Sequence, residues 1–159
     1  MKTSHAIIVI LIVLLLTGLV LVSLKSNDDV AYTPPEEENV LPVTGCYVAT
    51  TGGDVYTLHI ISQEGEIVSG TLDFNNFQKD SSHGTLVGTY RNSILLGDYS
   101  FTSEGTDSVM QIVFKRVGDN FVRGYGPLDT TGTRFSDLSQ ITYDSSNTLF
   151  LFKSASCTS

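Results

Sequence analysis

Of the three histidines in the chain, two lie outside the amino-terminal apolar segment and have a side chain suited to acid–base catalysis. His59 occurs in the alternating run VYTLHII, where we expect it on the polar side of a strand, beside Thr57 and opposite Ser69. A serine and a histidine become catalytic only with an orienting acid and an oxyanion site, and the chain contains no G-x-S-x-G nucleophile elbow. We therefore interpret His59 as an exposed strand residue, and His83, in KDSSHGT, as a polar loop residue.

Three carboxylates, Asp98, Glu104 and Asp107, lie closest together in the strand-rich region. Paired carboxylates can hydrolyse glycosidic bonds. However, Glu104 and Asp107 belong to SEGTD, a sequence typical of a hairpin turn. No D-x-D-x-D-G calcium loop occurs either. The sequence predicts a protein that is not an enzyme and that holds no metal or cofactor.

Cys46 and Cys157 are the two cysteines of the chain. Cys46 ends LPVTGC, which matches both a sortase signal and a lipoprotein cleavage box. A sortase signal precedes a carboxy-terminal apolar tail, and a lipoprotein box adjoins the apolar run, so position favours neither. An even pair of cysteines at the two ends of an exported domain predicts a disulfide. The alternative, a metal pair or a reactive thiol, lacks a histidine at ligand spacing along the sequence.

The first 25 residues contain an uncharged apolar run from 6 to 24. At about 1.5 Å of rise per residue, this run forms a helix as long as the hydrocarbon layer is thick. A cleavable signal sequence is the alternative, but its apolar region is shorter and ends at a small-residue cleavage site. We predict a transmembrane anchor at 1–25. Its amino terminus is cytoplasmic, because Lys2 precedes the span and acidic residues follow it.

Residues 26–44 contain Pro34, Pro35 and three glutamates, a composition typical of an extended linker. The linker places a domain at 45–159 outside the plasma membrane, in the periplasm or at the cell surface. The chain carries a net charge of −8 and no basic run longer than Lys115 and Arg116, which argues against nucleic acid as a partner. The expected partners are the membrane and either a small apolar ligand or an envelope protein.

Short alternating runs rich in β-branched and aromatic residues follow Tyr47. Four of them, IVSGTLDF, TLVGTYRN, ILLGDYSF and FVRGYGPL, carry a glycine in the middle, which marks a bend or a close backbone approach. We predict an all-β fold, an antiparallel up-and-down meander closed or nearly closed into a small barrel of about eight strands. Its first and last strands are expected at 45–51 and 147–154, joined near their ends by the disulfide.

Turn chemistry predicts the register of four hairpins, and all four registers place the same apolar residues on one face. The candidate ligand-lining or core residues on that face are Tyr56, Leu58, Tyr90, Tyr99, Met110 and Phe114. The predicted cross-strand pairs are Ile60 with Val68, Gly88 with Leu95, Tyr99 with Met110, and Phe114 with Gly124.

The opposite, polar face contains a candidate partner surface. Lys115 and Arg123 are expected opposite each other there, where two like charges suggest an acidic partner or simply screened surface charge. Val87, Ile94 and Leu96 form an apolar group on the same face. This group is either a contact site or a surface covered by residues 127–139.

The run YSFTSEGTDSVMQIVFKRVGDNFVRGYG, with Phe135 and a cysteine near the end, resembles small exported lipocalin-like β-barrel domains of uncharacterised bacterial lipoproteins and membrane-anchored proteins. The resemblance covers most of 45–157, and its markers are Ser103 to Gly105, Phe114, Gly124 and Gly126. It implies no particular activity. The Gly-x-Trp signature of true lipocalins is missing because the chain has no tryptophan, so transport is an analogy from the fold.

Two functions are compatible with this pattern. The first is a membrane-tethered, extracytoplasmic, lipocalin-like module that binds a small apolar ligand inside the barrel or a partner at its rim. The second is a structural or inhibitory envelope protein with a solid barrel, which acts through its outer wall. Inward-facing glycines favour the second function if they let the walls close together.

Overall fold

The computed structural model describes residues 42–157, which belong to a unit spanning Asn39–Ser159. The predicted anchor at 1–25 lies outside the described residues, as does all but the end of the linker predicted at 26–44.

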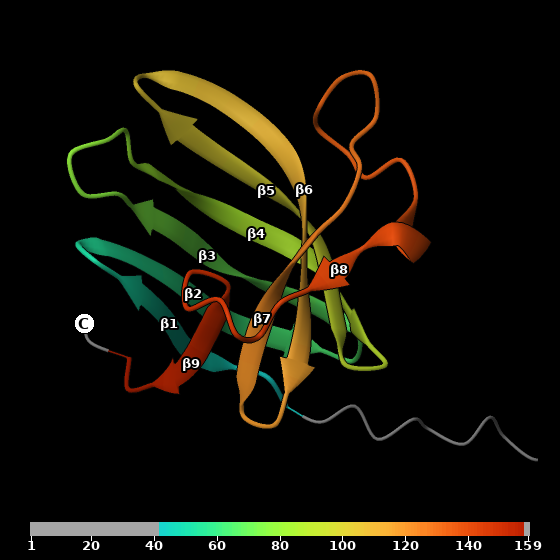
Figure 1. Ribbon diagram of the computed structural model, residues 1–159. Helices are drawn as coiled ribbons and strands as arrows, with labels where there is room; N and C mark the ends of the chain where they lie inside the picture. The colour runs from blue at the N-terminus through green and yellow to red at the C-terminus, as the bar shows by residue number, and fades with distance from the viewer. Residues whose placement is uncertain (1–41, 158–159) are drawn as a thin grey trace, which may run out of the picture. The chain divides into compact units, whose positions relative to one another are not determined.

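Nine strands and one short 3₁₀ helix follow one another along the described chain (Figure 1). Each hairpin joins strands that are adjacent in sequence, as expected for a meander. The elements are β1 (Gly45–Thr51), β2 (Asp54–Glu64), β3 (Ile67–Asn75), β4 (Ser82–Arg91), β5 (Ile94–Ser103), β6 (Thr106–Val117), β7 (Asn120–Tyr125), η1 (Leu138–Gln140), β8 (Thr142–Tyr143) and β9 (Leu151–Ala155).

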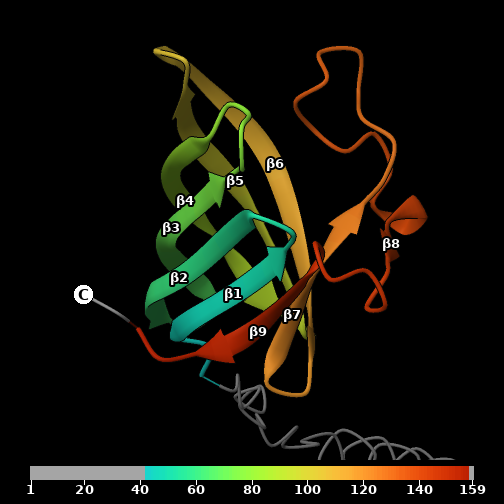
Figure 2. The same ribbon diagram turned by 60° about the vertical axis from the view of Figure 1, so that its left-hand side comes forward.

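Eight of these strands close into a barrel, which confirms the predicted antiparallel meander. Strands β1 to β7 pair in chain order, and β9 completes the ring by pairing with β7 on one side and β1 on the other. Figure 2 shows β9 running between β1 and β7. The extra strand β8 pairs only with the end of β7, where Gly124 lies opposite Tyr143.

The register of the β5–β6 hairpin is the predicted one, with Tyr99 opposite Met110. Its turn residues Glu104 and Gly105 have φ values of 49° and 75°, which suit the primed turn that a two-residue hairpin needs. In the β4–β5 hairpin the turn lies one residue later than predicted, at Asn92 and Ser93, both with positive φ. The pairing therefore shifts by two residues, and every side chain keeps its predicted face.

The β2–β3 pairing also differs from the prediction by two residues. Ile60 lies opposite Gly70 rather than Val68, and a bulge at Ile61 separates this register from that of the hairpin end. A Cβ atom on Gly70 would overlap the carbonyl oxygen of His59, so only glycine lets the two strands approach beside the bulge. The predicted close approach at this glycine therefore coincides with a strong local bend.

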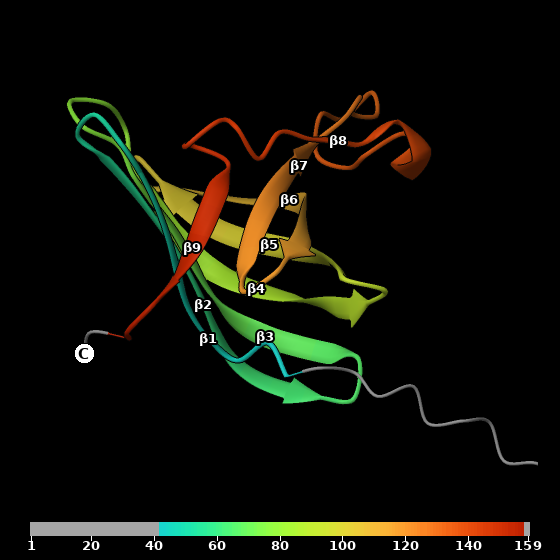
Figure 3. The same cartoon turned by 60° about the horizontal axis from the view of Figure 1, so that its bottom comes forward.

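Gly88 and Gly97 lie directly opposite each other in β4 and β5. A Cβ atom on Gly88 would lie 2.6 Å from the Cα atom of Gly97 and would overlap the Leu96 carbonyl oxygen. The obstacle is backbone on both sides, so no side-chain movement can relieve it. This pair lets the sheet coil tightly enough to close, as Figure 3 shows along the curved wall of β1 to β5.

Replacing Gly88 with alanine is therefore expected to lower the free energy of unfolding by about 3 kcal/mol, the upper part of the usual range for overpacking. Urea unfolding followed by circular dichroism measures the change. Thr89→Ala, at the adjacent exposed position, is the matched control, with an expected change below about 1 kcal/mol. Equal stability of Gly88→Ala and the wild type would contradict the close approach.

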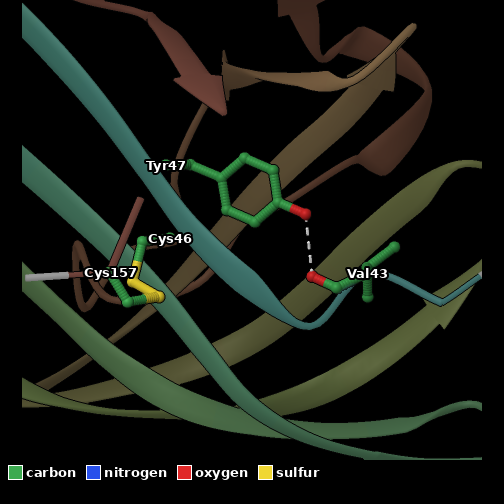
Figure 4. Close-up of a disulfide and its surroundings, with 4 residues drawn as sticks. All are labelled: Val43, Cys46, Tyr47 and Cys157. Atoms are coloured by element: carbon green, nitrogen blue, oxygen red, sulfur yellow. Dashed lines mark hydrogen bonds between the residues drawn. A yellow bond between two sulfur atoms is a disulfide. The ribbon is translucent and has the colours of Figure 1, made fainter. Parts of the chain in front are cut away.

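The interior of the barrel differs between its two ends. At the end that carries the β2–β3, β4–β5 and β6–β7 turns, aromatic rings fill the centre, with Phe121 4.9 Å from Tyr47 and 6.2 Å from Tyr90 between ring centroids. Residues 42–44 close this end, because Val43 is fully buried and its carbonyl oxygen accepts a hydrogen bond from the Tyr47 hydroxyl (Figure 4). We call it the closed end.

The opposite end carries the β1–β2, β3–β4 and β5–β6 connections, and we call it the open end. Several of its interior side chains pack against the core but are only partly buried, whereas Phe74 and Tyr99 here are buried. In addition, β6 pairs with β7 only over Phe114–Val117, so the two strands separate towards this end. The partly buried interior residues here are Tyr56, Phe101, Met110 and Arg123.

The unit that contains the barrel has the features expected of an independently folding domain. Its hydrophobic core, its closed ring of strands and its disulfide all lie within 42–157. A domain of this size with one continuous core and a closed barrel is expected to be stable by itself. Binding experiments can therefore use residues 39–159.

Candidate functional site

Arg123 lies on the interior face of β7, which corrects its predicted position beside Lys115 on the outer wall. The β6–β7 turn contains two residues, beginning with Gly118, instead of the three predicted. Phe114 therefore pairs with Arg123, and Lys115 pairs with Val122. A register change of one residue moves every side chain of a strand to the other face.

Gly118 explains the shorter turn. Its φ of 59° at the first central position is the conformation that a type II′ turn requires and that glycine adopts without strain. The turn also places Phe121 in the core, fully buried and opposite Phe152 of β9.

Aromatic rings surround the Arg123 guanidinium at the open end. Its central carbon lies 4.6 Å from the ring centroid of Phe74 and 5.1 Å from that of Tyr125. A cation over the face of an aromatic ring is attracted by the ring's quadrupole. Burial lowers the pKa of Arg123, while Tyr125, Tyr56 and Tyr99 act in the opposite direction. Arginine nevertheless keeps its charge, because its guanidinium does not lose a proton in proteins.

No residue in 42–157 forms a hydrogen bond or an ion pair with the Arg123 guanidinium. The ion pairs within this part of the chain join other arginines to acids, such as Arg134 to Asp98 at 3.1 Å and Arg91 to Glu66 at 3.4 Å. Arg123 is thus a half-buried cation whose neighbours are rings rather than carboxylates.

Three tyrosines lie within electrostatic reach of Arg123. Burial raises the pKa of Tyr56, Tyr99 and Tyr125, and the charge of Arg123 only partly offsets this effect. Each hydroxyl therefore stays protonated at neutral pH and can donate a hydrogen bond. The Tyr56 hydroxyl donates to Asn76 Oδ1 at 2.9 Å.

The predicted lining residues divide between the two ends. Leu58, Tyr90 and Phe114 are buried in the core, and Phe114 packs against Phe121 with ring centroids 6.3 Å apart. Tyr56, Tyr99 and Met110 lie towards the open end, where Tyr99 stacks on Phe101 at 4.8 Å. Within this second group Tyr99 is buried, so Tyr56 and Met110, which are partly buried, are the residues that an interior ligand can reach.

The predicted apolar patch on the outer face is divided. Val87 is exposed, whereas Ile94 and Leu96 are half-buried. Leu96 pairs with Val113, which is buried. Val113 and Ile141, the residue before β8, both lie close to Gly124. The residues near Val113 are Ile141 and Tyr143, which follow the segment 127–139 that was predicted to cover the patch.

Lys115 remains on the exposed outer face. Its Nζ atom lies 5.7 Å from the centroid of the Tyr143 ring in β8. With Arg123 in the interior, Lys115 has no cationic neighbour across the β6–β7 pair, and the predicted basic pair on the outer wall does not form.

A shallow depression of about 520 Å³ crosses β4, β5 and β6 near the open end. Most of its lining side chains point outward, among them His83, Asp107 and Val109. The Asp107 carboxylate accepts a hydrogen bond from Thr102 Oγ1 at 2.6 Å, as expected for a group that supports the hairpin.

Cys46 and Cys157 form the predicted disulfide, with the two sulfur atoms 2.09 Å apart (Figure 4). His59 pairs with Cys46 across β1 and β2, so all three residues offer ligand atoms within 4.8 Å of one another. Spacing along the chain does not reveal this neighbour, because Cys46 and His59 come together only across two paired strands. In the oxidised protein neither sulfur is a thiolate, which is the form that binds metal.

The expected neighbours of His59 also change. His59 lies opposite Thr71 rather than Ser69, whose hydroxyl instead lies 2.8 Å from that of Ser62. Among the carboxylates, Asp98 pairs with Arg134 and Glu104 occupies the exposed β5–β6 turn. Each of these acids therefore has a structural role in a surface contact or a turn.

Within 42–157, no helix has the length and apolar character needed to cross a bilayer. Comparisons of the chain with models of protein families, with curated proteins and with solved structures give no match.

Proposed function

We propose that this protein is a membrane-tethered, extracytoplasmic, lipocalin-like module that binds a small amphipathic ligand at the open end of its barrel. The barrel is the binding unit, and the apolar run at 6–24 is its anchor. The protein uses no catalytic residues in this function.

The partly buried interior of the open end is the observation that carries the proposal. Here Tyr56, Phe101 and Met110 face the core and yet remain accessible to solvent. Ligand sites in barrels are typically apolar and aromatic surfaces at the mouth, with a few polar groups that fix orientation. The closed end lacks this character, because Phe114, Phe121 and Phe152 fill it completely.

Two further features support the location. A disulfide forms and persists in oxidising compartments outside the cytoplasm. The apolar run and the acidic linker that precede the barrel have the lengths expected of an anchor and a spacer. Together they favour an extracytoplasmic site of action close to the membrane surface.

Binding of the neutral fluorophore N-phenyl-1-naphthylamine to residues 39–159 tests the proposal, since its emission rises on transfer from water to an apolar site. We expect saturable binding to the wild type. Met110→Trp fills the open end from the interior face of β6 and is expected to weaken binding at least ten-fold, about 1.4 kcal/mol.

Val109→Trp is the matched control, because Val109 is the adjacent residue on the outer face and is 50% exposed. It also lines the outer depression. Unchanged binding in Val109→Trp together with loss in Met110→Trp places the ligand inside. The reverse pattern would move the site to the outer depression and overturn the interior proposal.

The solid-barrel alternative draws its support from the closed end and from Val87, which is 57% exposed on the outer face. It describes a structural or inhibitory envelope protein that acts through its outer wall. Absence of saturable fluorophore binding to the wild type would favour it over the ligand-binding module.

A further inference from the structure

The charge of Arg123 is left without an anionic partner in the described chain. The guanidinium is half-buried, which weakens its hydration, and no carboxylate in 42–157 forms an ion pair with it. Partly buried charges are normally paired, because removing a charge from water without compensation is unfavourable. An unpaired cation facing the interior of a barrel is therefore a candidate for an external anion.

The rings around Arg123 leave its hydrogen-bond donors free. Phe74 and Tyr125 contact the guanidinium through ring faces, at 4.6 and 5.1 Å from their centroids. A guanidinium can stack on rings through its flat faces and still present its N–H groups at the edges, in a fork that matches a carboxylate. The rings thus hold the cation in place without using its donors.

Two acids, Asp54 and Asp73, act electrostatically on the tyrosines near Arg123. Asp54 accepts a hydrogen bond from the Phe77 backbone N–H at 2.7 Å, and its other carboxylate oxygen lies 3.4 Å from the Tyr56 hydroxyl. Asp73 influences Tyr99 electrostatically but forms no ion pair with Arg123. Neither acid neutralises the guanidinium.

We propose, on the basis of the function proposed above, that the ligand is an amphiphile with a carboxylate head group and that Arg123 binds this carboxylate at the open end. The apolar chain of the ligand lies against Met110 and Phe101. Tyr125, whose ring centroid lies 5.1 Å from the guanidinium carbon, supplies a further donor to the same carboxylate through its hydroxyl. The preference of the module for a carboxylate thus depends on Arg123. Its affinity for apolar molecules in general does not depend on this residue.

Competition with N-phenyl-1-naphthylamine on residues 39–159 tests this inference, with decanoate and 1-decanol as competitors of equal chain length. We expect decanoate to displace the fluorophore at a concentration at least about ten-fold lower than 1-decanol requires, because hydrogen bonds to a charged group contribute more than those to a neutral one. In Arg123→Met the preference disappears, while fluorophore and 1-decanol binding remain. Arg123→Lys keeps the charge without the fork and retains part of the preference.

Lys115→Met is the matched control, since it removes the same charge from the adjacent strand but on the outer face. Its preference for decanoate is expected to equal that of the wild type. Equal loss in Lys115→Met and Arg123→Met would mean that net charge alone attracts decanoate and would overturn the inference.

The outcomes separate the two proposals. If the wild type binds the fluorophore but does not distinguish decanoate from 1-decanol, the carboxylate site is wrong and the ligand-binding module stands. If the wild type binds neither the fluorophore nor decanoate, both proposals fail. The comparison of competitors on the wild type, together with Arg123→Lys, decides the question even if Arg123→Met does not fold.

Discussion

Replacing Cys46 and Cys157 with alanine is expected to lower the free energy of unfolding by about 4 to 5 kcal/mol. The two cysteines are 111 residues apart, and the chain-entropy model assigns this value to a loop of that length, since the cross-link restricts the unfolded chain. Urea unfolding of residues 39–159 measures it, as a lower midpoint in the variant.

Reductant provides the control for this prediction. It should lower the unfolding midpoint of the wild type towards that of the double-alanine variant, and it should leave the variant itself unchanged. A variant as stable as the oxidised wild type would show that the cross-link contributes nothing to the folded barrel.

Replacing Phe121 with alanine is expected to lower the free energy of unfolding by about 3 to 5 kcal/mol. The Phe121 side chain is fully buried, and its ring meets those of Tyr47, Tyr90 and Phe114 at centroid distances of 4.9 to 6.3 Å. Its loss leaves a cavity at the closed end that these aromatic neighbours cannot fill without rearrangement. The same urea experiment measures the effect.

Phe77→Ala tests whether burial is the cause, because Phe77 has the same side chain but is 59% exposed in the β3–β4 loop. We expect a change of about 0.5 kcal/mol or less, as for most surface positions. Similar effects of the two substitutions would contradict the assignment of Phe121 to the core.

The barrel could be predicted from the sequence because side chains alternate between the two faces of a strand. A register error of two residues therefore leaves each side chain on its correct face. The shifts at Gly70 and at Asn92 both preserve the face of the core residues, so these residues were placed on the correct side, whereas beyond the bulge the end of β2 is displaced by an odd number of residues. The bulge at Ile61 left no recognisable signal in the alternation. The short β8 was also not foreseen, since two residues are too few to show a period.

The candidate site was not predicted, because it depends on a single residue of register. A three-residue loop after Val117 places Arg123 outside, and a two-residue turn places it inside. One signal was present: Gly118 followed by Asp119 fits a type II′ turn as a two-residue connection. The neighbours of Arg123 could not have been identified, because Phe74 approaches it from a strand far away in the sequence.

The position of β9 determines the order in which the barrel can be assembled. Synthesis proceeds from the amino terminus, and β1 pairs with β2 and with β9, the last strand of the barrel. Until β9 is in place, β1 and β7 present unpaired edges that can pair with other chains. The bond between Cys46 and Cys157 is therefore a covalent mark that the last strand has docked.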